Sequence, residues 1–149
     1  MKEEVFIASD HAGFKAKERL ISLLKTKYYT IDLGPHKLIP SDDYPDYAFR
    51  LAEKVVKTKS QGILICKSGI GMSIAANKVN GARAALAINS KTAKLSRQHN
   101  NANILALPAE IPISKAKQIV QAFLSTKFIN ESRHVRRIKK IENYEKWPL

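Results

Sequence analysis

The chain has 149 residues, a single cysteine, and 26 lysines and arginines against 13 acidic residues, which gives a net charge of +13. A chain of this length can bury a core of its own, and one cysteine excludes an internal disulfide and suits a reducing compartment. No apolar run approaches the roughly 20 residues of a membrane-spanning helix and no apolar leader opens the chain, so we expect a protein of the cytoplasm. The positive charge favours anionic partners, either phosphorylated small molecules or nucleic acid.

Short apolar runs alternate with segments of helical periodicity along the chain. In chain order, the apolar runs predict strands over residues 5–9, 29–33, 62–66, 83–88 and 102–107. The periodic segments predict helices over residues 13–27, 46–57, 70–79, 90–100 and 112–124. Ser90 is expected to cap the fourth of these helices. A last amphipathic helix with a basic face has its apolar residues at Val135, Ile138, Ile141 and Tyr144.

This alternation of strands and helices predicts the fold class. Five short strands separated by helices favour a parallel sheet that is covered on both faces. We therefore expect an α/β protein with one domain over residues 1–149, built as three α/β/α layers in a Rossmann- or flavodoxin-like strand order 2-1-3-4-5. In that order, ligands bind where the carboxyl ends of strands 1 and 3 meet. Asp10-His11 and the segment from Cys66 to Gly69 would then share one crevice.

The most informative segment is the glycine turn that follows the third strand. Cys66 ends the apolar run and is followed by Lys67-Ser68-Gly69-Ile70-Gly71, which leads into a helix. Free N–H groups at such a turn bind anions, and a thiol beside them ionises more readily than in water. The alternative is an inert thiol of the core with plain turn glycines beside it.

Five short motifs occur in the order found in a known family. They are Ser9-Asp10-His11-Ala12-Gly13, Asp43-Tyr44-Pro45, the run from Cys66 to Lys78, Leu95-Ser96-Arg97-x-His99-Asn100, and Arg133-His134-x-x-Arg137. Together they resemble the type B ribose-5-phosphate isomerases and the related galactose-6-phosphate isomerase subunits over nearly the whole chain. Each motif alone is weak, whereas five in register are specific.

The resemblance implies an aldose–ketose isomerase that uses neither metal nor cofactor. Such an enzyme interconverts ribose 5-phosphate and ribulose 5-phosphate through a cis-enediolate. It also implies a homodimer or a dimer of dimers, with each active site shared between two subunits. By this resemblance, Cys66 is the base that moves a proton between C2 and C1 of the sugar, and Ser68 assists proton transfer between O1 and O2.

The resemblance assigns the remaining site residues as well. The turn of Lys67, Gly69, Ile70 and Gly71 would offer N–H groups to the enediolate oxygen. His99 would open the sugar ring, reaching in from the partner subunit. The residues expected to hold the substrate are Asp10 and Tyr44 for the sugar, Asn100 for support of the anion turn, and His11, Arg133 and Arg137 for the phosphate.

Each of these residues also has a structural interpretation. Asp10 could cap the following helix, and His11 could bind the backbone at the start of that helix. His99 lies near a predicted helix end, where a capping role is as reasonable as a catalytic one. The arginines belong to a run of charge that is commonly a solvated helix face.

Two departures from the family pattern stand out. Lys67 occupies a position where the family usually has glycine, and a positive φ there would add strain of about 1 kcal/mol or more. Pro108-Ala109-Glu110 replaces a common Gly-x-Arg segment, which exchanges a phosphate-binding charge for a carboxylate. Lys67 could compensate for the missing arginine.

These departures keep open an isomerase of a six-carbon phosphosugar, such as galactose 6-phosphate or allose 6-phosphate. A non-catalytic module that binds phosphate or nucleic acid is less favoured, because the basic residues are scattered and no basic-aromatic recognition motif occurs.

Overall fold

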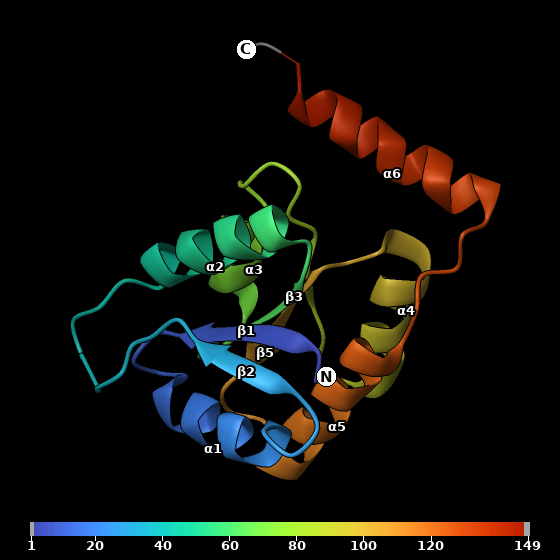
Figure 1. Cartoon of the computed structure of the whole chain (residues 1–149). Coiled ribbons are helices and arrows are strands. Elements are labelled where there is room, and N and C mark those ends of the chain that lie inside the picture. The colour runs from blue at the N-terminus through green and yellow to red at the C-terminus, as the bar shows by residue number, and fades with distance from the viewer. Residues whose placement is uncertain (1, 148–149) are drawn as a thin grey trace.

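The computed structural model describes residues 2–147 and contains one parallel sheet within that range (Figure 1). Its strands are β1 (Glu4–Ser9), β2 (Tyr29–Asp32), β3 (Gln61–Cys66), β4 (Ala84–Leu86) and β5 (Ile104–Pro108). Each strand lies within the predicted apolar runs or a residue or two beyond them. The central strands β1, β3 and β5 are buried along almost their whole length, because helices cover both of their faces.

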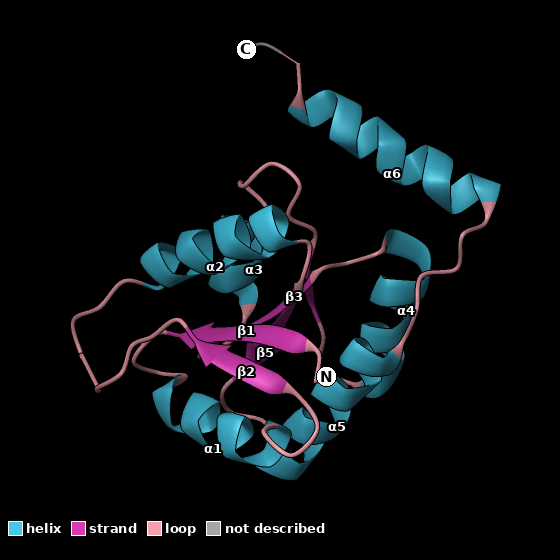
Figure 2. Cartoon of the chain, in the orientation of Figure 1, coloured by secondary structure: helices cyan, strands magenta, loops and turns pink. Residues whose placement is uncertain are grey.

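Helices form a layer on each side of the sheet (Figure 2). They are α1 (Phe14–Leu24), α2 (Tyr44–Thr58), α3 (Ile70–Ala76), α4 (Ser90–Asn100), α5 (Ile113–Ser125) and α6 (Ser132–Glu145). Apolar residues of α1, α4 and α5 form one core cluster with one face of the sheet, and those of α2 and α3 form the other. The expected three-layer α/β/α fold is confirmed. No helix within residues 2–147 is both long and apolar enough to cross a membrane.

The observed strand order is β2-β1-β3-β5-β4, which exchanges the last two strands of the expected order. β4 has only three residues, all half-buried, and therefore suits the edge of the sheet. β5 is fully buried from Ile104 to Leu107 and takes the inner position beside β3. The exchange brings residues 108–110 next to the cysteine, where the Ala109 N–H donates to the Cys66 carbonyl at 2.8 Å. The switch point between β1 and β3 is unaffected.

Two helix ends differ from the expected ones for identifiable reasons. Ser90 is the first residue of α4, and the cap is Asn89, whose side chain accepts the Thr92 N–H at 2.8 Å. The third helix is shorter than expected and ends at Ala76. The next residue, Asn77, uses its side-chain amide to bond both backbone groups of Ala84, which tethers the edge strand β4.

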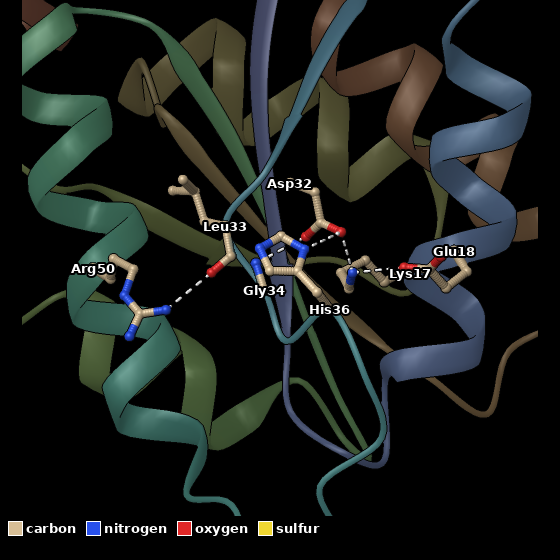
Figure 3. Close-up of polar contacts among 7 residues, drawn as sticks. All are labelled: Lys17, Glu18, Asp32, Leu33, Gly34, His36 and Arg50. Atoms are coloured by element: carbon tan, nitrogen blue, oxygen red, sulfur yellow. Dashed lines mark hydrogen bonds and ion pairs between the residues drawn. The ribbon is translucent and has the colours of Figure 1, made fainter.

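A buried ion pair supports the carboxyl end of β1 from the side of β2 (Figure 3). Lys17 of α1 is wholly buried, and its ammonium donates to Asp32 at 2.5 Å. The other oxygen of Asp32 accepts the Gly34 N–H at 2.8 Å. The Gly34 carbonyl in turn accepts the Ser9 N–H at 3.1 Å. This chain of bonds fixes the backbone immediately before Asp10, because a buried charge must remain paired.

Candidate active site

Asp10 lies at the carboxyl end of β1 beside the end of β3. Its backbone N–H donates to the Ile65 carbonyl at 3.2 Å, one residue before Cys66. Its carboxylate is buried, and one oxygen accepts the Gly13 N–H at 3.0 Å, so it does support the start of α1. A Cβ on Gly13 would lie 2.4 Å from the Ile65 carbonyl oxygen, so only glycine permits this close approach of the two segments.

The Cys66 thiol is buried and receives a backbone N–H from the turn that follows it. Only 5% of the residue is exposed, and the Gly69 N–H donates to Sγ at 3.1 Å. Gly69 has a φ of 76°, and a Cβ there would lie 2.6 Å from Leu86, so the turn requires glycine. The thiol thus belongs to a buried core cluster and also accepts one defined hydrogen bond from the turn.

The rest of the turn is open to solvent. Ser68 is exposed, and its hydroxyl oxygen accepts the Ile70 N–H at 3.3 Å. Lys67 is also exposed. Among residues 2–147, the non-glycine residues with positive φ are Lys59 and Asn101. The backbone strain expected at Lys67 is therefore absent, and lysine fits the turn without distortion.

The aromatic ring of Tyr44 lies against the start of α3. A Cβ on Gly71 would come within 2.6 Å of Cζ of that ring, which shows how closely the two residues approach. Tyr44 is the first residue of α2 and is 40% exposed, so its ring borders both Gly71 and solvent. This arrangement brings the Asp43-Tyr44-Pro45 motif to the same sheet edge as the cysteine turn.

His11 pairs with Asp42, a loop residue that is not among the predicted site residues. Nδ1 of His11 lies 2.7 Å from Oδ1 of Asp42, and the same oxygen accepts the His11 N–H at 3.0 Å. The hydrogen bond to Asp42 raises the pKa of His11 above its ordinary value, partial desolvation opposes this, and the charge of Asp10 adds to the rise. A histidine held toward its cationic form at this edge suits an anionic ligand.

His99 and Asn100 do not reach this edge within one chain. α4 begins after the carboxyl end of β4, and its 11 residues carry it about 16 Å toward the opposite edge. Arg97, two residues before His99, lines a groove of about 910 Å³ together with Glu4 and Gln61, the first residues of β1 and β3. The end of α4 therefore lies at the amino edge of the sheet, opposite Cys66.

The helix α6 belongs to the same amino edge and stands outside the three layers (Figure 1). Near its end, Glu145 accepts the Gly81 N–H at 3.0 Å, and Glu142 lies 3.6 Å from Arg83. Arg133 and Arg137 are exposed, and their spacing of four residues places them on one face of the helix. One chain thus brings together Asp10, His11, Tyr44, Cys66, Ser68, Gly69, Ile70 and Gly71, but not His99, Asn100, Arg133 and Arg137. Within residues 2–147, no group of three or more His, Cys, Asp or Glu side chains could hold a metal ion.

A parallel α/β sheet with a carboxylate, an imidazole and a thiol gathered at its switch point is typical of α/β enzymes that bind a small molecule there. Comparison with known proteins identifies the kind of enzyme. The family model described as Ribose/Galactose Isomerase matches residues 5–141. The chain belongs to the Ribose/Galactose Isomerase family, and it is an isomerase. The resemblance found from the five motifs is confirmed.

Similar proteins cover nearly the whole chain. The "Probable ribose-5-phosphate isomerase B" of Mycoplasma genitalium is 49% identical over 98% of this chain and 98% of its own length. The ribose-5-phosphate isomerase B of Mycobacterium tuberculosis is 41% identical over 95% of this chain and 90% of its own. The crystal structure of the Mycoplasma genitalium enzyme with bound ribulose-5-phosphate matches with a TM-score of 0.94 and 47% identity, over 99% of both chains.

Proposed function

We propose that this protein is a cytoplasmic type B ribose-5-phosphate isomerase that interconverts ribose 5-phosphate and ribulose 5-phosphate without a metal or cofactor. The observation that carries the proposal is the match over 99% of the chain to a ribose-5-phosphate isomerase B crystallised with ribulose-5-phosphate. The gathering of a buried thiol, a carboxylate and a paired histidine at the β1–β3 switch point supports it, since these groups fit a small phosphorylated substrate.

In the proposed reaction, Cys66 removes the proton from C2 of the open-chain aldose and the negative charge moves onto O1, which forms the enediolate. Ser68 assists the movement of the proton between O2 and O1, and Cys66 then returns its proton to C1, so that no atom is gained or lost. The N–H of Gly69, which donates to the thiol sulfur at 3.1 Å, holds the sulfur in place for this role. Backbone N–H groups of the same turn would stabilise the charge on the enediolate oxygen.

A shared site between two chains completes this proposal. His99 and Arg137 lie at the opposite sheet edge from Cys66, so one chain holds only part of the proposed machinery. A two-fold dimer presents the amino edge of each chain to the carboxyl edge of the other and thereby builds two equal sites. Ile70 and Ile74 of α3 are more than half exposed, and they offer apolar surface for such a contact. The assembly would be a homodimer or a dimer of such dimers.

A six-carbon phosphosugar is the second candidate substrate, and one observation favours it. The observed strand order places Pro108 beside Cys66, so Glu110 follows close to the proposed site. A carboxylate at this position repels a dianionic phosphate, whereas the arginine that the family commonly has there attracts one. A longer sugar would move its phosphate away from Glu110.

The test of function is isotope exchange on a panel of phosphosugars. Ribose 5-phosphate, galactose 6-phosphate and allose 6-phosphate are each incubated in D₂O with the full chain, and exchange at C2 and product formation are followed by NMR. We expect the highest kcat/KM with ribose 5-phosphate. A higher kcat/KM with a six-carbon sugar would overturn the substrate assignment, and no exchange with any of the three would overturn the proposed activity.

The shared site has an independent test, which is subunit complementation. Cys66→Ala and His99→Ala each disable one half of the site, and the two inactive variants are mixed under conditions of subunit exchange. Half of the dimers then contain both variants and one intact site, so about a quarter of wild-type turnover should return. Each variant mixed with itself is the control. If the mixed sample stays as inactive as the controls while subunits exchange, each site belongs to one chain.

A further inference from the structure

Two histidines from different helices stack on each other at the amino edge of the sheet. The ring of His134, in the first turn of α6, lies 4.6 Å from the ring of His99, at the end of α4, with an angle of 12° between the planes. His134 is 4% exposed, although Arg133 and Val135 on either side of it are exposed. The buried ring of His134 therefore packs the start of α6 against the end of α4.

A carboxylate connects this histidine pair to the helix that carries the arginines. Oε2 of Glu131 accepts a hydrogen bond from Nε of Arg133 at 2.8 Å and lies 3.9 Å from Nε2 of His134. The buried Nε2 of His134 has no hydrogen-bond partner among residues 2–147, and Glu131 is the carboxylate in its immediate neighbourhood. His99, His134, Glu131 and Arg133 thus form a continuous chain of neighbours.

We propose that His134 is a positioning residue, which holds the ring of His99 and ties it through Glu131 to the phosphate-binding Arg133. This inference rests on the proposed function, in which His99 opens the sugar ring and Arg133 binds the phosphate. A substrate bound by its phosphate then meets an imidazole in a fixed orientation, and such alignment contributes to rate because a displacement of about 1 Å can cost a hundredfold.

The chemistry of the pair suits a ring that positions without transferring a proton itself. Burial lowers the pKa of His134, and the nearby His99, Arg133 and Arg137 lower it further, while Glu131 opposes them. His134 consequently stays neutral where an exposed histidine would take up a proton. A neutral His134 adds no positive charge beside the ring of His99, so the two rings can stack without repulsion from that side.

The experiment compares a substrate that needs ring opening with one that does not. Ribose 5-phosphate is mostly cyclic, whereas ribulose 5-phosphate is an open chain because its O5 carries the phosphate. In the His134→Ala protein, we expect kcat for ribose 5-phosphate to fall about tenfold or more. Exchange of the C1 proton of ribulose 5-phosphate with D₂O should change less than about threefold, since this exchange uses Cys66 and not His99.

Three further variants separate positioning from a merely structural role. His134→Phe keeps a flat ring against His99 and should recover most of the lost turnover. His134→Ala made in the His99→Ala protein should cause no additional loss, because a residue that acts through His99 has nothing left to position. Arg136→Ala, an exposed change on the same helix, should match the wild type on both substrates.

Each result decides the inference. If wild type converts ribose 5-phosphate and His134→Ala matches it, or lowers both reactions equally, His134 does not position His99. An additional loss in the double variant with His99→Ala, or no recovery with His134→Phe, would also overturn the role. If the wild type itself does not convert ribose 5-phosphate, the proposed function fails, which is a separate outcome from failure of the positioning role.

Discussion

The two edges of the sheet carry different halves of the proposed site, and they are built differently. At the carboxyl edge, Asp10, Cys66 and Gly69 follow buried strands and are held by backbone hydrogen bonds. At the amino edge, His99 ends a helix and Arg137 stands on α6, which lies outside the layers (Figure 1). The fold of one chain therefore suffices to bring together the groups proposed for proton transfer, with His11 beside them. The proposed ring-opening His99 and the arginines proposed for phosphate binding would join them only in an assembly of chains.

This difference predicts where substitutions act. A change at the carboxyl edge affects groups packed against the core, so it should alter the chain's own stability or chemistry. A change on the exposed face of α6 should leave the free energy of unfolding nearly unchanged and alter catalysis only in the assembled protein.

Cys66→Ala should have the largest effect on activity. Removal of the proposed base should lower exchange at C2 of ribose 5-phosphate by about a thousandfold or more. Binding should remain nearly intact, because only a small buried side chain is lost. NMR exchange in D₂O measures the first quantity, and calorimetric titration with ribose 5-phosphate measures the second. Substantial residual exchange would show that a different group removes the proton.

Arg137→Ala should weaken substrate binding without weakening the fold. Loss of a charge-assisted contact to phosphate should raise KM for ribose 5-phosphate about tenfold. Arg136→Ala is the matched control, because adjacent residues do not share a helix face. Denaturant unfolding should give the same free energy for both variants and the wild type, within about 0.5 kcal/mol. An equal rise in KM for the two variants would indicate general electrostatic attraction in place of a specific contact.

Gly71→Ala should produce the opposite pattern, with a loss of stability at the carboxyl edge. The added methyl would lie 2.6 Å from the Tyr44 ring, and such overpacking costs about 1–3 kcal/mol. Chemical denaturation measures this loss directly. Tyr44→Ala removes the opposing ring, so the double variant should lose less stability than the sum of the two single changes. An additive result would mean that the ring moves aside without cost.

Asp42→Asn should shift the pH dependence of substrate binding. The hydrogen bond to Asp42 raises the pKa of His11, with Asp10 adding to the rise, so its removal should lower that pKa toward the ordinary value of about 6.5. If cationic His11 binds phosphate, KM rises as pH increases through this pKa, and in the variant the rise should begin at lower pH. KM measured across pH 5.5–8.5, roughly one unit or more around that value, tests this. His11→Asn should show no such inflection, and an unmoved inflection in Asp42→Asn would assign it to another group.

The fold class could be predicted because the strands and helices follow simple periodicities, whereas the order of β4 and β5 could not. A helical crossover permits either order, and the deciding difference is burial: β4 is three half-buried residues and β5 is buried through Leu107. The partner of His11 was missed because Asp42 is 31 residues away in a loop of common composition. The direction of α4 separates His99 from Cys66 within one chain, whereas the expectation that His99 reaches in from a partner subunit came from the family resemblance and not from periodicity.

Lys67 is the residue at the carboxyl edge that the family pattern does not explain, and its replacement should have the smallest effect. Lys67→Gly removes an exposed side chain from the residue after Cys66, whose strand partner Pro108 lies two residues before Glu110. If Lys67 compensates for the arginine that Glu110 replaces, KM for ribose 5-phosphate should rise severalfold, since an exposed charge is screened by solvent. Because Lys67 does not have a positive φ, glycine relieves no strain and should lower stability by about 0.5–1 kcal/mol through chain entropy.

The second change in this test is Glu110→Arg, which returns a positive charge to the segment after β5. In the Lys67→Gly protein it should restore KM, whereas in the wild type it should lower KM less, because Lys67 already supplies a charge. Unchanged KM and kcat in Lys67→Gly would end the compensation hypothesis and leave the lysine as a tolerated surface residue. Restoration by Glu110→Arg would instead show that the segment after β5 adds a phosphate contact to that proposed for His11 at the carboxyl edge of one chain.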